Sequence, residues 1–308
     1  MGTERHQLTL GKYVSGVQSD YALSIGGVAD YYIEVASVVE LASAVSGAIA
    51  SQLPYLVIGG GNRVLFSDGG YPGLLIRNRS NSLVRSADHS QIIVDSGMPL
   101  SQLVTQTAAW ELGGLTPFYG QTATVGGALY ADLAVGSCHF AASLRSATVL
   151  MPPTRLKLEA KIVRHPASWL FDPKESGSRL HRLRVAADPF GLAPILLSAT
   201  LQLTNNRSSE LMGQIRRSSS RLSVIPRGAV GPLFEPLLEG DLDSLLRPLA
   251  KAIKSGAVSL DHHAPNYARA RGRMRASDLR ILIEAVEAKI LESAGIRLRG
   301  RYEYMGVW

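Results

Sequence analysis

Hydrophobic positions in the first eighty residues repeat first with the period of a strand and then with that of a helix. Apolar runs predict strands over residues 31–35 and 55–58. Ser37 and Glu40 have the spacing of a capping box, which predicts a helix that begins after Ser37. One face of that helix would carry Val38, Leu41, Ala42, Val45 and Ile49. The pattern predicts a βαβ unit and a small α/β domain over residues 1–78.

A second set of apolar runs predicts another domain over residues 79–205. Residues 92–97 read as a strand, and residues 100–111 read as a helix that ends at Gly113-Gly114. Further strands are expected over residues 147–151, 156–163 and 195–203. The polar stretch 204–209 predicts a linker.

The remaining residues, 206–308, predict a third α/β domain. It would begin with a helix over residues 210–223 and close with a helix over residues 278–293. Ser277 is expected to cap the last helix, and Gly295 to end it. The predicted fold class is therefore α/β (α+β) in three domains.

Composition narrows the class of protein. The 308 residues are 46% hydrophobic and 19% charged, which is typical of a globular chain with a substantial core. No apolar run reaches the roughly 18 residues of a membrane helix, and no signal peptide is evident, so we expect a cytoplasmic protein without a membrane partner. Cys138 is the single cysteine, which excludes an intrachain disulfide and a multi-cysteine metal site.

Positive charge is concentrated in the last third of the chain. The net charge is +7, and from Arg207 onward 17 Lys and Arg face 11 Asp and Glu, which leaves +6. Alternation predicts one side of an extended segment for Arg269, Arg271, Arg273 and Arg275. Such a row is either a solvated edge or an electrostatic funnel for a nucleotide diphosphate. A nucleic-acid partner is not expected, because no helix-turn-helix, RNP or zinc spacing accompanies the arginines.

Two glycine-rich loops are the strongest chemical signal. Gly59-Gly60-Gly61 follows an apolar run, and Thr124-Val125-Gly126-Gly127 lies further along. The first loop lacks the Lys-Ser/Thr pair of a P-loop and the third glycine of a dinucleotide fingerprint. Three glycines can make a tight turn only, but two such loops favour one large phosphate ligand.

These loops resemble the UDP-N-acetylenolpyruvoylglucosamine reductases, flavoenzymes of peptidoglycan precursor synthesis, and the resemblance runs nearly from end to end. The segments that carry it lie in family order: residues 24–29, residues 58–65 with 67–70 and Gly73, residues 120–128, and His263-Ala264 with Asn266, residues 276–278 and residues 295–298.

The resemblance implies a fold of the vanillyl-alcohol-oxidase/PCMH type, with two FAD-binding subdomains and a C-terminal substrate domain. It implies non-covalent FAD, NADPH as co-substrate and a nucleotide sugar as the small-molecule partner. The FAD-binding residues it implies are Gly59, Gly60, Gly61, Asn62, Arg63, Val64, Leu65, Gly120, Thr122, Thr124, Val125, Gly126 and Gly127.

The three catalytic roles of the family fall on altered residues. Pro232 stands at the position of the acidic serine, and proline has neither a hydroxyl nor an amide proton. Lys174, two residues before Ser176, matches the arginine position, and Arg301 stands at the glutamate position. Glu303 lies two residues later and would keep the same face of a strand. The expected catalytic residues are therefore Lys174, Ser176 and Glu303.

Other reactive side chains have either a functional or a purely structural interpretation. The resemblance implies contacts between the nucleotide sugar and His263 or Asn266, and we add Arg269 and Arg271 as substrate-binding residues; the alternative for the first two is a hydrogen-bonded turn. Neighbours such as Cys138-His139 seldom face each other in a strand. Asp261-His262-His263 lacks helical spacing and an evident third ligand, so no metal is expected.

Two classes of function stay open from the sequence. One is a divergent NADPH-dependent reductase that takes its proton from another group. The other is a catalytically retired paralogue that binds FAD or a nucleotide sugar as a regulatory or scaffold protein. A flavoprotein that acts on another substrate is a third alternative.

Overall fold

A computed structural model describes residues 14–15, 25–87, 90–153, 160–170, 193–222, 229–237 and 240–308. The chain folds as two compact units. Among the described residues, unit 1 takes in Tyr31–Gly60 and Gly73–Arg221, and unit 2 takes in 25–30, Gly61–Pro72 and Leu222–Trp308. The chain therefore leaves unit 1 between Gly60 and Gly61 and returns at Gly73. The three-domain division stays a prediction.

Unit 1 is built on a five-stranded antiparallel sheet in the order β12-β11-β13-β7-β6. Its strands are β6 Leu83–Arg85, β7 Gln91–Asp95, β11 Leu144–Met151, β12 Lys161–Pro166 and β13 Ile195–Gln202. The strands predicted near residues 92, 147 and 195 are confirmed. The strand predicted over 156–163 is β12, but its first residues lie outside the described ranges.

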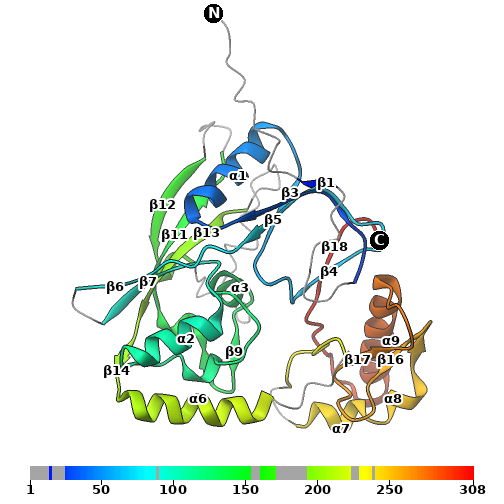
Figure 1. Ribbon diagram of the computed structural model, residues 1–308. Coiled ribbons are helices and arrows are strands. Elements are labelled where there is room, and N and C mark those ends of the chain that lie inside the picture. Colours follow the sequence, from blue (N-terminus) through cyan, green and yellow to red (C-terminus); the bar gives the residue numbers. More distant parts are fainter. Residues whose placement is uncertain are drawn as a thin grey trace, which may run out of the picture. The chain divides into compact units, whose positions relative to one another are not determined.

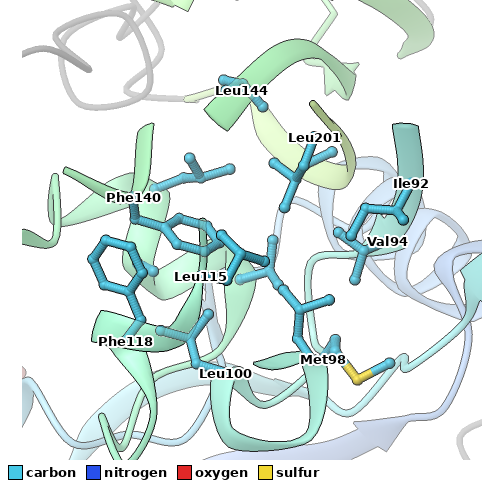
Figure 2. Close-up of a cluster of buried hydrophobic side chains, with 14 of the residues drawn as sticks. Ile92, Val94, Met98, Leu100, Leu115, Phe118, Phe140, Leu144 and Leu201 are labelled. Atoms are coloured by element: carbon cyan, nitrogen blue, oxygen red, sulfur yellow. The ribbon is translucent and has the colours of Figure 1, made fainter. Parts of the chain in front are cut away.

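Helices cover both faces of this sheet (Figure 1). One face packs on α2 (Leu100–Ala109) and α3 (Val125–Tyr130). Figure 2 shows the side chains of Ile92, Val94 and Leu201 facing those of Leu100 and Leu115 in this core. Phe118 and Phe140 meet edge to face, with ring centroids 5.3 Å apart, an arrangement favoured by the ring quadrupoles. Short elements complete this side: β8 Leu112–Gly113, η2 Thr116–Phe118, β9 Ala134–Val135, β10 Cys138–His139, η3 Phe140–Ser143 and α4 Ala167–Leu170.

The opposite face packs on α1 (Val38–Ala50). Strand β13 has a bulge on this face. Thr148 of β11 pairs with Ser198, whereas the next residue, Val149, pairs with Leu196. Leu197 is thus the extra residue, and it turns to the α1 side although Ala199 and Leu201 face the other core. The α1 helix also contacts β2 (Ala29–Val35) and β5 (Tyr71–Asn78), which belong to a sheet of order β1-β2-β5-β3. The other strands of that sheet are β1 Val14–Ser15 and β3 Tyr55–Ile58, and β3 runs parallel to β5.

The predicted cap of α1 is confirmed. The Ser37 hydroxyl accepts a hydrogen bond of 3.2 Å from the Glu40 amide. The Glu40 carboxylate reaches back to the amide of Ala36, one residue before the cap, at 2.8 Å. The helix therefore begins where the capping box placed it.

The polar stretch predicted as a linker contains a strand. β14 (Thr204–Asn205) pairs with β8, and α6 (Ser208–Leu222) follows it. Leu211 and Ile215 lie four residues apart on one helical face and are buried in the core of unit 1. The polar residues before α6 give no sequence signal of this contact with the preceding sheet.

The described part of unit 2 packs three small strands, three helices and one parallel strand pair around its own core. Its elements are β4 Val64–Phe66, α7 Leu242–Leu246, α8 Leu249–Ala252, β15 Lys254–Ser255, β16 Val258–Leu260, β17 Ala268–Ala270, α9 Ala276–Ala294 and β18 Glu303–Met305. The core centres on α9, whose Leu279, Ile283, Val286 and Ile290 are buried. No helix of the described residues is long and apolar enough to cross a membrane.

The ends of α9 give one confirmed prediction and one wrong one. Gly295 ends the helix in the left-handed conformation, with φ 68°, as predicted. The helix begins at Ala276 rather than after Ser277, so Ser277 lies in its first turn. The carboxylate of Asp68, 208 residues before Ala276, accepts the hydrogen bonds that a local cap would take.

Candidate functional site

The two glycine loops touch within unit 1. A Cβ atom added to Gly59 would lie 2.4 Å from Oγ1 and 2.8 Å from Cγ2 of Thr124. Any side chain at position 59 would therefore overlap with a β-branched residue that has few ways to move. Gly59 is required as glycine because the second loop lies against its backbone.

Thr124 is held in place by its role at the start of α3. Its hydroxyl accepts a hydrogen bond of 3.2 Å from the Gly127 amide. The amides of Val125 and Gly126 donate to the carbonyls of Met98 (2.9 Å) and Ser96 (2.7 Å). These three loop amides therefore have protein acceptors, and the stretch from Thr124 to Gly127 offers its shape and the Thr124 side chain to the first loop.

The first loop is different in this respect. Among the hydrogen bonds of the described residues, none uses the amide of Gly60 as donor. A bare glycine amide beside a closely packed second loop fits the needs of a phosphate oxygen. The residues present in unit 1 therefore fit a diphosphate-containing cofactor.

A polar group behind the second loop was missed by the sequence analysis. Asn78 donates through Nδ2 to the Ser96 hydroxyl at 2.9 Å and accepts through Oδ1 from the Ser80 amide at 3.0 Å. Gly97 packs against this group, since an added Cβ would lie 2.6 Å from the Ser80 amide nitrogen. The Ser96-Gly97 pair at the end of the predicted strand 92–97 was the available signal.

The later residues of the predicted first loop pack in unit 2. Arg63 forms an ion pair of 2.7 Å with Glu235, and the Arg63 carbonyl accepts a hydrogen bond of 2.8 Å from the Glu303 amide. Val64 and Leu65 lie in β4, which pairs with β18. The roles of Asn62, Arg63, Val64 and Leu65 in cofactor binding stay predictions.

The structure brings together three of the positions considered for catalysis. The Arg301 amide donates to the carbonyl of Leu233, the residue after Pro232, at 2.8 Å. Arg301 Nε lies 3.6 Å from Oε1 of Glu235, so one carboxylate faces both Arg63 and Arg301. Glu303 follows two residues later in β18. The predicted residues Lys174 and Ser176 lie outside the described residues.

The predicted substrate-binding residues are engaged in local hydrogen bonds. Asn266 Oδ1 accepts from the amides of Leu233 and Phe234, and Nδ2 donates to the Phe234 carbonyl. Asn266 thus clamps the segment that carries Pro232. His263 is exposed, and its amide donates to Asp261 at 2.9 Å.

Asp261 is the acceptor around which this turn is built. Burial alone would raise its pKa, but the hydrogen bonds of the Ala264 and His263 amides and of Arg269 hold the pKa below its ordinary value. Arg269 Nε lies 2.7 Å from Asp261 Oδ2. The substrate contacts assigned to His263, Asn266, Arg269 and Arg271 stay predictions.

The row of four arginines on one extended segment is wrong. Strand β17 ends at Ala270, and Gly272 has φ 104°, which turns the chain. Arg275 stands at the start of α9, 3.6 Å from Asp68. The alternation in the sequence concealed a bend at a glycine.

Cys138 and His139 lie in a short antiparallel pair with β9, where Cys138 is exposed. His139 Nδ1 lies 3.7 Å from Oδ1 of Asp132. Within the described ranges, no cluster of His, Cys, Asp and Glu could hold a metal ion.

Comparison with known proteins agrees with the cofactor site. A family model described as an FAD binding domain matches residues 29–154. UDP-N-acetylenolpyruvoylglucosamine reductase of Synechococcus sp. (strain WH7803) is 30% identical over 92% of this chain and 89% of its own length. The protein of that name from Rubrobacter xylanophilus is 28% identical over 99% of this chain and 98% of its own length.

The fold has a solved counterpart. The crystal structure of UDP-N-acetylenolpyruvylglucosamine reductase from Thermus caldophilus matches with a TM-score of 0.71 and 21% identity, over 96% of this chain and 99% of that one. The expected α/β FAD-binding fold is confirmed. The chain belongs to the UDP-N-acetylenolpyruvoylglucosamine reductase family, and it is a flavoprotein whose cofactor is FAD.

Proposed function

We propose that this protein is an NADPH-dependent reductase that acts on the enolpyruvyl ether of UDP-N-acetylglucosamine and yields UDP-N-acetylmuramate. The proposal is supported by relatives of that name that match over nearly their whole length. The observation that carries it is the contact of Gly59 with Thr124, which joins the two glycine loops in unit 1.

On the cofactor side, we propose that Gly59, Gly60 and the loop from Gly120 to Gly127 hold the diphosphate of FAD. FAD supplies hydride chemistry when bound, which the side chains of the protein cannot supply. The task of the protein is to bind and orient the reactants and to deliver one proton. Thr124 orients the first loop through its contact with Gly59, and the carbonyls of Ser96 and Met98 orient Thr124 and α3.

On the proton side, the mechanism must differ from the family pattern. Pro232 has no proton to give, and the neighbouring Arg301 is a cation that does not act as an acid at neutral pH. We propose Glu303 as the acid, or a water held by Ser176, with Lys174 as the positive charge near the substrate. These residues would protonate the carbon next to the one that accepts the hydride.

One observation favours a second candidate function, a retired paralogue that binds FAD or a nucleotide sugar without turnover. The resemblance predicts that Pro232 and Arg301 occupy two catalytic positions, and the Arg301 amide donates a hydrogen bond to the carbonyl of Leu233, the residue after Pro232. Both changes thus fall in one small region of unit 2. This candidate predicts a protein that does not turn over the sugar, and it is yellow only if FAD is the ligand that it binds.

The visible spectrum of the purified protein tests the proposal. A reductase is yellow, loses its colour when NADPH is added without oxygen, and regains it when the enolpyruvyl UDP-sugar follows. Bleaching without any recovery would support the retired paralogue. A protein that is colourless and cannot be reconstituted with FAD would contradict the reductase and would favour a retired paralogue that binds only a nucleotide sugar.

A further inference from the structure

The segment that follows the first glycine loop forms strand β4, which pairs with β18 near the C-terminal end of the chain. Strand β4 runs parallel to β18, with Val64 opposite Glu303 and Phe66 opposite Met305. Just beyond this pair, the Ser67 amide donates to the Met305 carbonyl at 2.9 Å. The backbone from Arg63 to Ser67 is therefore hydrogen-bonded to a strand far outside the matched FAD binding domain, 29–154.

The turn that follows is packed too closely to shift without moving its neighbours. A Cβ on Gly306 would lie 2.1 Å from the Gly70 carbonyl oxygen. A Cβ on Gly27 would lie 2.5 Å from both the Asp68 carbonyl oxygen and the Gly70 amide nitrogen. The Ser67 hydroxyl closes the turn with a hydrogen bond of 3.0 Å to the Gly70 carbonyl.

Asp68, inside this turn, caps helix α9. Its two carboxylate oxygens accept from the amides of Ala276 (2.9 Å) and Ser277 (3.1 Å) and from the Ser277 hydroxyl (2.6 Å). A negative charge at a helix N-terminus is favoured by the helix dipole, and here the helix has 19 residues. The cap joins the turn to the largest helix of unit 2.

We infer that Asp68 is a positioning residue for FAD binding: by capping α9 it fixes the turn and β4, and with them the backbone that Gly59-Gly60-Gly61 enters. The inference rests on the proposed use of the first glycine loop for FAD. It makes β18 and the first two residues of α9, Ala276 and Ser277, part of the machinery that orders the first glycine loop, although Ala276 lies 208 residues after Asp68. Loss of the cap leaves the loop more conformations and lowers the fraction that is ready to bind.

The affinity for FAD of the full chain, measured by flavin fluorescence after removal of bound flavin, tests this inference. We expect Asp68→Ala to weaken FAD binding about tenfold, the factor that corresponds to 1.4 kcal/mol. Asp68→Asn keeps one acceptor oxygen, so its affinity for FAD should lie between those of the wild-type chain and of Asp68→Ala. Ser277→Ala removes only the hydroxyl donor and should weaken binding less than either Asp68 variant.

A matched control separates positioning from general loss of stability. Ile290 is buried in the same helix, and at about 1.5 Å per residue it lies about 21 Å along the axis from Ala276. Ile290→Val should destabilise the chain by a similar amount with unchanged FAD affinity. Hydrogen exchange without FAD should rise in peptides covering residues 61–72 for Asp68→Ala, and not selectively there for Ile290→Val.

The outcomes distinguish the inference from the proposed function. A wild-type chain that binds FAD, with equal affinity in Asp68→Ala, overturns the inference alone. Equal weakening in Asp68→Ala and Ile290→Val also overturns it, since stability would then account for both. A wild-type chain that binds no FAD overturns the proposed function and this inference together.

Discussion

The glycine loops of unit 1 and the segment 231–236 of unit 2 differ in what each retains of the family pattern. At Gly59 and Thr124 the need is steric, and it is met: the contact admits no side chain at position 59. At Pro232 and Arg301, where the family resemblance predicts the catalytic serine and glutamate, the need is chemical, and neither side chain can supply a hydroxyl or a carboxylate. The proposed function therefore separates cofactor binding from proton delivery in one chain.

The largest effect is expected from Pro232→Ser, which returns a hydroxyl to segment 231–236. A positioned general acid commonly contributes 10²- to 10⁴-fold, so we expect turnover with the enolpyruvyl UDP-sugar to rise about 100-fold or more. Steady-state oxidation of NADPH measures it. Unchanged turnover would show that the missing hydroxyl at position 232 is not what limits turnover.

Gly59→Ala should break the other side of the comparison. The new Cβ would overlap with Thr124, and relief of such overpacking costs about 1–3 kcal/mol, so FAD affinity should fall by up to about 100-fold. Flavin fluorescence titration measures the change. Gly213→Ala is the control, since its Cβ would meet only Arg217 Nη1 at 3.7 Å; equal affinities in the two variants would contradict the contact.

Glu235→Gln removes the carboxylate that faces Arg63 and Arg301. The two cations would then lose the counter-charge that they share, while partial exposure to water limits the cost. We expect a loss of about 1 kcal/mol in the free energy of unfolding, measured with urea. Glu284→Gln breaks an exposed pair four residues apart on α9 and should cost less. Equal losses would show that the shared carboxylate contributes nothing special.

The smallest expected effect is the dependence of the free energy of unfolding on acid pH. Burial alone would raise the pKa values of Asp68 and Asp261, but hydrogen bonds and nearby arginines hold both below the ordinary 3.8. Near that pH the unfolded chain binds more protons, so these groups stabilise the fold above about pH 4 and lose that contribution as pH falls through their folded pKa values. The free energy of unfolding, measured with urea, should decline less steeply between pH 7 and pH 3 in a double variant, Asp68→Asn with Asp261→Asn, than in the wild-type chain. An equal slope would contradict the assignment.

Local patterns predicted the regular elements well. Apolar runs located β7, β11 and β13, and the Ser37-Glu40 spacing located the start of α1, because these features depend on neighbouring residues. The cap of α9 could not be found this way, since its acceptor is Asp68, 208 residues earlier. The bend at Gly272 was hidden because the arginines around it alternate as a strand would.

The candidate site was predicted only in part. The glycine loops stood out because repeated glycines are unusual after an apolar run. Their contact in the structure explains why position 59 must be a glycine. The passage of the chain from unit 1 to unit 2 between Gly60 and Gly61 has no local signal. The support of the second loop by Ser96 and Asn78 was missed because single polar residues near a strand end are common.

Single-turnover kinetics of the FAD-loaded full chain, followed without oxygen at the flavin absorbance, compares the two regions most directly. We expect rapid reduction by NADPH and slow reoxidation by the enolpyruvyl UDP-sugar, with Pro232→Ser accelerating only the second phase. Slow reduction with rapid reoxidation, or acceleration of both phases alike, would contradict the separation of cofactor binding from proton delivery.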